Sequence, residues 1–265
     1  MRIRDRVFVV TGAGSGIGQA VTLDLLSRGA RVAAADLRPE GLSQTIDHAR
    51  ADQTRLVAYP VDITDRGAVE ELPAQVLADF GQVDGVLSIA GIIQPFVHID
   101  HMSMEQIERV MNVNFWGTLY VDLAFLPLLE QRPQACLVNV SSMGALVPVP
   151  GQGIYGASKG AVKLLTEALY AELRDSSVAV TVVFPGGVGT NITQNSGVQT
   201  PAIPEGKMPK VTAVGDAARQ IVDAVEKGRL RVVIGKDARM LDRLSRLAPE
   251  RAIRLVADRM KALLG

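Results

Sequence analysis

The chain contains very little cysteine, few aromatic residues and no excess of either charge. Its single cysteine, Cys136, excludes an internal disulfide and is typical of a protein from a reducing compartment. Lysine and arginine total 28, as do aspartate and glutamate, so no net charge draws the chain toward nucleic acid. Six phenylalanines, four tyrosines and one tryptophan are too few for a surface on which bases stack. These counts argue against a nucleic-acid-binding protein.

Long uninterrupted hydrophobic runs are also missing. No uncharged apolar run approaches the length of about 18 residues that indicates a membrane-spanning helix. Residues 1–12 pass directly into a strand-like run and a glycine-rich turn, without the apolar stretch and cleavage site of a signal peptide. We therefore predict a soluble cytoplasmic protein with no transmembrane segment.

The residues that are abundant indicate an α/β fold. Short runs rich in β-branched residues alternate with longer helical patterns, and these runs are apolar on both faces. Such runs are typical of a parallel sheet that helices cover on both sides. We predict one Rossmann-type domain over residues 1–265, doubly wound, with about seven parallel strands. The runs are 6–10, 31–36, 56–62, 85–91, 135–142, 178–187 and 231–235.

Two segments interrupt this alternation. Residues 189–212 carry three prolines and no apolar period, which is typical of a lid or a binding loop. We expect this substrate loop to order when cofactor and substrate bind. Residues 236–265 form amphipathic, arginine-rich helical patterns, and we expect a C-terminal helical extension. Its helices could pack against the domain or an oligomer neighbour, or lie on an anionic membrane surface.

A glycine cluster follows the first strand and precedes the first helix. Gly12, Gly16 and Gly18 allow a sharp turn that brings backbone N–H groups and a helix N-terminus to a pyrophosphate. The following strand ends at Asp36, whose carboxylate could hold both ribose hydroxyls of an adenosine and repel a 2′-phosphate. We predict NAD as cofactor, with NADP possible because Arg38 is a nearby cation. The residues expected at the cofactor here are Gly12, Gly14, Ser15, Gly16, Ile17, Gly18, Asp36, Leu37 and Asp62.

Asp62 has two interpretations. It follows the third strand and could accept a hydrogen bond from the adenine amino group, or it could cap the next helix. A second capping signal is clearer, because Ser103 and Gln106 form a capping box that opens the helix carrying Asn114.

A phenol and an ammonium lie one helical turn apart at Tyr155 and Lys159. A cation beside the phenol favours the phenolate, but lowering its pKa from about 10 to about 7 needs roughly 4 kcal/mol. A bound oxidised nicotinamide would supply a second positive charge. Ser142 ends the fifth strand, where its hydroxyl could donate to a substrate oxygen, and Asn114 could hold a water near the lysine. We predict these four residues as the catalytic set.

The motifs occur in a characteristic order along the chain. They are TGAGSGIG at 11–18, Asp36, VDI at 61–63, SIAG at 88–91, VNFWG at 113–117, Ser142, YGASK at 155–159 and PGGVGT at 185–190. This set closely resembles the short-chain dehydrogenase/reductase family over roughly the first three quarters of the chain.

The resemblance implies a role for each matched residue. Tyr155 would be the general acid/base, Ser142 would position the substrate oxygen, and Asn114 would anchor a proton-relay water. Lys159 would bind the nicotinamide ribose and lower the Tyr155 pKa. Further cofactor contacts implied are Ile63, Ala90, Gly91, Tyr155, Lys159, Pro185, Gly186, Val188 and Thr190. The family usually has NNAG where this chain has Ser88–Gly91, so we expect altered bracing there and unchanged cofactor binding.

The predicted substrate walls are mainly apolar and contain no arginine or lysine that would clamp an anion. We therefore predict an oxidoreductase acting on an apolar, uncharged secondary alcohol or ketone, which could be steroid-like, aryl or aliphatic. A catalytically idle dinucleotide sensor is the alternative. We predict no metal, because His98 and His101 have no third ligand in sequence. The expected substrate contacts are Ile92, Gln94, Ser142, Gly144, Val149, Tyr155, Gly186 and Ile192.

The helix that carries Tyr155 has apolar residues on two faces. Covering a sheet needs one such stripe, so the second, which includes Leu164 and Ala168, predicts burial against a partner. In the resembling family this helix and the preceding long one pair across a two-fold axis. We predict a homo-oligomer, a tetramer more than a dimer.

Overall fold

A computed structural model describes residues 1–50, 54–199 and 211–264. Seven parallel strands form one sheet in the order β3-β2-β1-β4-β5-β6-β7. The chain order reverses direction between β1 and β4, which creates the crevice where doubly wound proteins bind ligands. The sequence prediction of a seven-stranded parallel sheet is confirmed. The strands are β1 (Val7–Thr11), β2 (Arg31–Asp36), β3 (Leu56–Pro60), β4 (Gly85–Ser88), β5 (Ala135–Val140), β6 (Val178–Pro185) and β7 (Arg231–Ile234).

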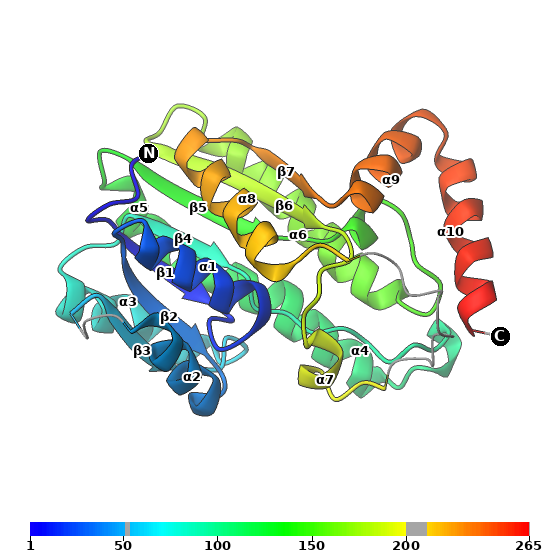
Figure 1. The fold of residues 1–265 in the computed structure, drawn as a ribbon, viewed down its shortest axis with the longest axis horizontal. Coiled ribbons are helices and arrows are strands. Elements are labelled where there is room, and N and C mark those ends of the chain that lie inside the picture. The colour runs from blue at the N-terminus through cyan, green and yellow to red at the C-terminus, as the bar shows by residue number, and fades with distance from the viewer. Residues whose placement is uncertain (51–53, 200–210, 265) are drawn as a thin grey trace.

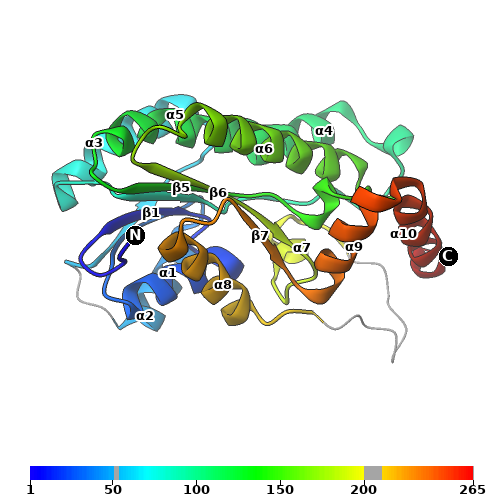
Figure 2. The same ribbon diagram turned by 90° about the horizontal axis from the view of Figure 1, so that it is seen from above.

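Helices cover both faces of this sheet (Figure 1, Figure 2). One layer contains α1 (Gly16–Ser27), α2 (Pro39–Ala49) and α8 (Val214–Lys227). The other contains α3 (Arg66–Phe80), α4 (Met104–Met111), α5 (Gly117–Glu130) and α6 (Gly153–Glu172).

The strands are buried because alternate side chains feed two separate cores. Phe8 and Val10 of β1 pack with Leu25 of α1 and Ile221 of α8. The side chains between them point to the other face, where Val9 belongs to the core that contains Phe125 of α5. Strands buried on both faces therefore read as continuous apolar runs.

The helical extension lies at one end of the molecule (Figure 1). It consists of α9 (Lys236–Leu247) and α10 (Pro249–Leu264), which pack against each other. Leu241 of α9 and Val256 of α10 enclose Val147, which follows β5. The extension thus backs the segment that was expected to form a substrate wall. Within the described ranges, no helix is both long and apolar enough to cross a membrane.

Candidate active site

The glycine-rich turn between β1 and α1 fits tightly against its own backbone. A Cβ at Gly18 would lie 2.1 Å from the Gly12 carbonyl oxygen, and one at Gly12 would lie 2.9 Å from Ala90. Gly12 also has a φ of +70°, which disfavours any residue with a side chain. Ser15 precedes α1, and its side chain caps none of the first-turn N–H groups. These groups are therefore available to an anion.

Asp36 lies at the carboxyl end of β2 and is almost completely buried. Its carboxylate accepts hydrogen bonds from the backbone N–H of Gly14 and of Arg38, both at 2.9 Å. The Arg38 guanidinium turns toward Ser15, to which it donates at 3.2 Å. The Asp36 carboxylate therefore faces the glycine-rich turn, and the Arg38 guanidinium lies beside Ser15 of the same turn.

A short helix after Thr190 closes over this turn. Asn195, in α7 (Ile192–Asn195), donates to the Ser15 hydroxyl at 2.9 Å and accepts from Arg38 at 2.8 Å. Ser196 accepts from the Ile93 backbone N–H at 3.0 Å, so the segment bridges the cofactor turn and the substrate side. The sequence did not indicate this clasp. Its residues, Asn195 and Ser196, belong to the first part of the expected loop at 189–212. The rest of that loop, residues 200–210, lies outside the described residues.

Asn114 lies in a π-helical turn, Asn112–Trp116, that separates α4 from α5. The helix that opens at the Ser103 capping box therefore contains an inserted residue at this turn, a feature common at functional sites. The Asn114 amide is buried, exchanges hydrogen bonds of 2.9 Å with both backbone groups of Ile92, and donates to Ser158 at 3.0 Å. Ser158 in turn donates to the Tyr155 carbonyl at 2.7 Å, which links this asparagine to the tyrosine helix.

The four predicted catalytic residues gather around two glycines. A Cβ at Gly91 would lie 3.0 Å from Lys159 Nζ and 3.1 Å from Asn114 Oδ1. A Cβ at Gly144 would lie 3.5 Å from Ser142 Oγ and 3.6 Å from the Tyr155 ring. The Ser142 hydroxyl accepts from the Gly144 N–H at 3.0 Å, and this bond fixes its direction at the end of β5.

The charges of this group depend on burial. Burial raises the pKa of the Tyr155 phenol, while a side-chain hydrogen bond with Ser142 acts in the opposite direction. Burial also lowers the pKa of Lys159 from 10.5 to about 8, so the ammonium form still dominates at pH 7. Its Nζ donates to the Val140 carbonyl at 3.0 Å. The protein alone therefore leaves the phenol protonated, in agreement with the sequence argument that a second cation is needed.

Two buried glutamines support the start of α6, and their roles were missed in the sequence. Gln94 was expected as a substrate contact, but its side chain is fully buried. Its Oε1 accepts from the Tyr155 backbone N–H at 2.9 Å, and its Nε2 donates to the Gly151 carbonyl at 3.0 Å. Gln152 donates to the Gln94 carbonyl at 2.9 Å. Gln94 thus braces the turn that carries the tyrosine.

The loop Pro185–Thr190 is held by the helical extension. The Asp237 carboxylate of α9 accepts from the Gly187 N–H at 2.8 Å. A Cβ at Gly186 would approach the Asp237 carboxylate closely, so a larger residue there would have to displace this carboxylate. Thr190 comes within van der Waals distance of Gly16, where a Cβ would lie 3.4 Å from it. The predicted nicotinamide-side loop therefore meets the glycine-rich turn.

Ser88, the departure from NNAG, joins a buried polar cluster. Its hydroxyl donates to Asp122 at 3.4 Å, and Asn139 donates to the same carboxyl group at 2.7 Å. Burial raises the pKa of Asp122 from 3.8 to about 7, against the effect of these bonds. The backbone N–H groups of Ile89 and Ala90 bond the Thr11 hydroxyl at 3.1 and 3.3 Å. Ser88 thus braces the end of β4 through Asp122, and the backbone after β4 stays close to β1.

The remaining expected residues are placed as follows. Asp62 accepts from the Thr64 N–H at 2.8 Å and does not cap α3, a role that Asp65 performs by accepting from Ala68. Leu37, which directly follows Asp36, is 64% exposed. The capping box of Ser103 is confirmed. Within the described part of the chain, no group of three or more potential ligands gathers as a metal site.

A parallel sheet with a glycine-rich turn at its switch point defines the class of doubly wound dinucleotide-binding proteins. The family model described as short chain dehydrogenase matches residues 6–200. The chain therefore belongs to the short-chain dehydrogenase family, whose members are oxidoreductases that use NAD or NADP.

Similar proteins cover almost the whole chain. SadH of Mycobacterium tuberculosis is 37% identical over 260 residues, which span 95% of this chain and 94% of SadH. A short-chain dehydrogenase/reductase from Burkholderia phymatum, solved in complex with NAD, has a TM-score of 0.85 at 26% identity and covers 96% and 97%. A short chain dehydrogenase from Burkholderia cenocepacia, in complex with NADP, has a TM-score of 0.81 at 28% identity and covers 97% and 99%.

Proposed function

We propose that this protein is an NAD-preferring dehydrogenase or ketoreductase that interconverts an apolar secondary alcohol and its ketone. The observation that carries the proposal is the convergence of Asn114, Ser142, Tyr155 and Lys159 beside the glycine-rich turn. A binding protein would need the turn alone. The four side chains in register at the carboxyl edge of the sheet favour catalysis.

The residues of the turn fit a dinucleotide. A side chain at Gly12 or Gly18 would fill the space through which the backbone approaches a pyrophosphate. The uncapped first turn of α1 adds free N–H donors, and no acidic residue lies in that turn to compete for them. Asp36 faces the same turn and is placed to accept from ribose hydroxyls.

The proposed mechanism gives each of the four side chains a role. The bound nicotinamide supplies the hydride acceptor or donor. Ser142 donates a hydrogen bond to the substrate oxygen, and Tyr155 exchanges a proton with that oxygen through its hydroxyl. The Lys159 ammonium favours the phenolate form of Tyr155 and binds the ribose. Asn114 is proposed to hold a relay water, for which Oδ1 keeps one acceptor lone pair beyond its bond from Ile92.

The NAD preference rests on charge. The Asp36 carboxylate faces the glycine-rich turn, and its repulsion of a 2′-phosphate there would favour NAD. Arg38 is the counterargument, but its guanidinium is shared between Ser15 and Asn195. Freeing it for a phosphate would break its bonds to Asn195 and Ser15, and this conflict supports the preference.

The substrate class rests on the walls of the site. Met143, Leu146 and Val149 are partly buried against the apolar cluster of α9 and α10. A wall of this composition favours an apolar alcohol or ketone over an anion. Because Gln94 is committed to α6, we place substrate contacts at Ile92, Gly144, Val149, Gly186 and Ile192, together with Ser142 and Tyr155.

The test compares wild type with Tyr155→Phe on a panel of apolar secondary alcohols with NAD, following the absorbance of reduced nicotinamide. Loss of the general acid/base should lower turnover by about 10²–10⁴ while NAD affinity stays the same. Near-normal turnover in the variant would refute the assignment. Wild type that binds NAD but oxidises or reduces no member of the panel would favour the sensor alternative.

Two further parts of the proposal concern assembly and location. Leu164 of α6 and Leu123 of α5 are 65% and 59% exposed, and a two-fold partner on these helices would cover them. We propose a homo-oligomer, a tetramer more than a dimer. The single cysteine, Cys136, is a buried free thiol, which supports a reducing compartment such as the cytoplasm.

A further inference from the structure

The outer face of α9 combines cations with exposed apolar side chains. Its members fall at single or paired positions that recur every three or four residues, so they share one side of the helix. Together they line an open groove of about 600 Å³. We call this set the α9 face. It consists of Lys236, Arg239, Met240, Arg243, Leu244 and Leu247.

Two apolar members of the α9 face are exposed although the helix has a buried side. Leu247 is 86% and Met240 41% exposed, whereas Leu241, which continues the same apolar stripe, is 5% exposed and packs against Val147. A helix that only covered the domain would have the whole of this stripe buried. The exposed part of the stripe indicates a surface that another apolar phase covers.

The cations of the α9 face have no acidic partner among the residues that the structure describes. No described carboxylate forms an ion pair with Lys236, Arg239 or Arg243. The two acids of α9 point elsewhere: Asp237 accepts from Gly187, and Asp242 pairs with Arg231 at 2.6 Å and with Arg246. The α9 face is therefore positive, within a chain of balanced overall charge.

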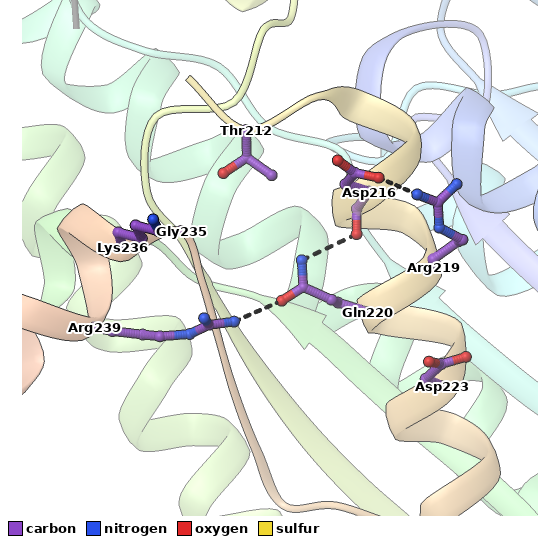
Figure 3. Close-up of a pocket in the computed structure, with 8 residues that line it drawn as sticks. All are labelled: Thr212, Asp216, Arg219, Gln220, Asp223, Gly235, Lys236 and Arg239. Atoms are coloured by element: carbon purple, nitrogen blue, oxygen red, sulfur yellow. Dashed lines mark hydrogen bonds and ion pairs between the residues drawn. The ribbon is translucent and has the colours of Figure 1, made fainter. Parts of the chain in front are cut away.

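The neighbouring cleft explains how Arg239 is held (Figure 3). This cleft of about 420 Å³ lies between α8 and α9, and its lining includes Lys236 and Arg239. Inside it, Asp216 pairs with Arg219, and Gln220 accepts from Arg239 at 2.9 Å. The Asp216 carboxylate is thus already paired, and the bond to Gln220 fixes the arginine at the rim of the α9 face.

We propose that the α9 face docks on an anionic lipid surface. Its cations would contact lipid phosphates while Met240 and Leu247 enter the interface between headgroups and acyl chains. Each cation close to such a surface strengthens binding roughly fivefold. Contact by all three would raise affinity by about a hundredfold over a neutral membrane.

Other occupants match the α9 face less well. A second copy related by a two-fold axis through the face would bring like charges together. A nucleic acid would neutralise the cations but leave Leu247, the most exposed of the large apolar residues described, without a partner. A surface that is both anionic and apolar satisfies both kinds of side chain.

Docking would place the lipid next to the proposed substrate site. The buried side of α9 contacts the wall at Val147, and Asp237 holds the loop of Gly187. An apolar alcohol or ketone dissolved in the bilayer would then have a short path to the site. This consequence rests on the proposed function, whereas the docking itself does not.

The experiment uses the full chain and sedimentation with vesicles of phosphatidylcholine, with and without phosphatidylglycerol. We expect binding to the anionic vesicles alone, weakening as salt increases. Arg243→Gln should lower affinity roughly fivefold, and Leu247→Ser should lower it at every salt concentration. The matched controls, Arg66→Gln and Ile46→Ser, lie on α3 and α2 at the far end of the molecule (Figure 1) and should bind as wild type.

Several results would overturn the proposal. These are absence of vesicle binding, equal binding to neutral and anionic vesicles, or losses in the control variants as large as those in the α9 variants. If the α9 variants lower the oligomeric order of a protein that binds no vesicles, the face joins copies of the chain instead. Tyr155→Phe should bind vesicles normally, so failure of the catalytic proposal can be distinguished from failure of this one.

Discussion

Replacing Gln94 with methionine tests how the tyrosine helix is positioned. Methionine has nearly the same volume and fills the same buried space without a polar atom. The substitution removes the bond from the Tyr155 N–H to Oε1 and the bond from Nε2 to the Gly151 carbonyl. The bond that Gln152 donates to the backbone carbonyl of residue 94 is unaffected.

The expected loss follows from the two groups left unpaired. The Gly151 carbonyl is buried and should cost about 1–3 kcal/mol, and the partly buried Tyr155 N–H should cost less. We expect the free energy of unfolding to fall by about 2–4 kcal/mol, which lowers Tm on the order of 10 °C in a chain of this size. A misplaced Tyr155 should also lower kcat by about tenfold to hundredfold.

The assay combines urea unfolding with a pH–rate profile at saturating NAD. If Tyr155 moves away from Lys159, the rise in kcat should shift to higher pH, which a general loss of stability would not cause. Gln152→Met is the matched control, since it removes a single donated bond and should cost less than about 2 kcal/mol. Equal losses in the two variants, or Gln94→Met with an unchanged pH profile, would show that Gln94 does not position Tyr155.

Three further predictions concern cofactor choice, pH and assembly. Asp36→Ala should narrow the preference for NAD over NADP in kcat/KM, and wild type that already prefers NADP would contradict the role given to this carboxylate. The pKa of Asp122 is about 7 in the folded protein against 3.8 in the unfolded chain, so the folded state binds the extra proton and its stability falls as pH rises from about 4 to 7. As pH rises across that window, the free energy of unfolding of Asp122→Asn should increase relative to that of wild type in denaturant titrations. A difference that does not change with pH would argue against a raised pKa of Asp122. Leu164→Glu should dissociate the oligomer in sedimentation at micromolar concentration. A wild type that is already a stable monomer would show that the exposed apolar stripe of α6 is not an oligomer interface.

The sequence predicted the parts of the site that local rules determine. Gly12 and Gly18 follow a strand and precede a helix, so their function in a tight turn was visible without the fold. Tyr155 and Lys159 lie one helical turn apart, and any helix places them on one face. The parallel sheet with helices on both faces also followed, because runs apolar on both faces indicate a covered parallel sheet.

The contacts missed in the sequence join segments that have no hydrophobic periodicity. Gln94 reaches Tyr155 across 61 positions, and Asn195 reaches Ser15 across 180. Each contact depends on how two loops meet at the sheet edge, which neither propensity nor spacing specifies. The same holds for the pairing of Asp237 with Gly187, which only the packing of α9 reveals.

The π-helical turn at Asn112–Trp116 makes the number of residues here as important as their identity. One residue more than a regular helix would hold rotates the following turns by roughly 100° about the axis. This offset lets Asn114 face Ile92 while Phe125, farther along, faces the sheet. Deleting one exposed residue, such as Asn112, would restore a regular helix. Either Asn114 would then turn away from Ile92, or the apolar stripe with Phe125 would turn away from the sheet. Evolution along this stretch can therefore exchange its exposed residues, such as Asn112 and Trp116, whereas a change in length has to be compensated elsewhere in the helix.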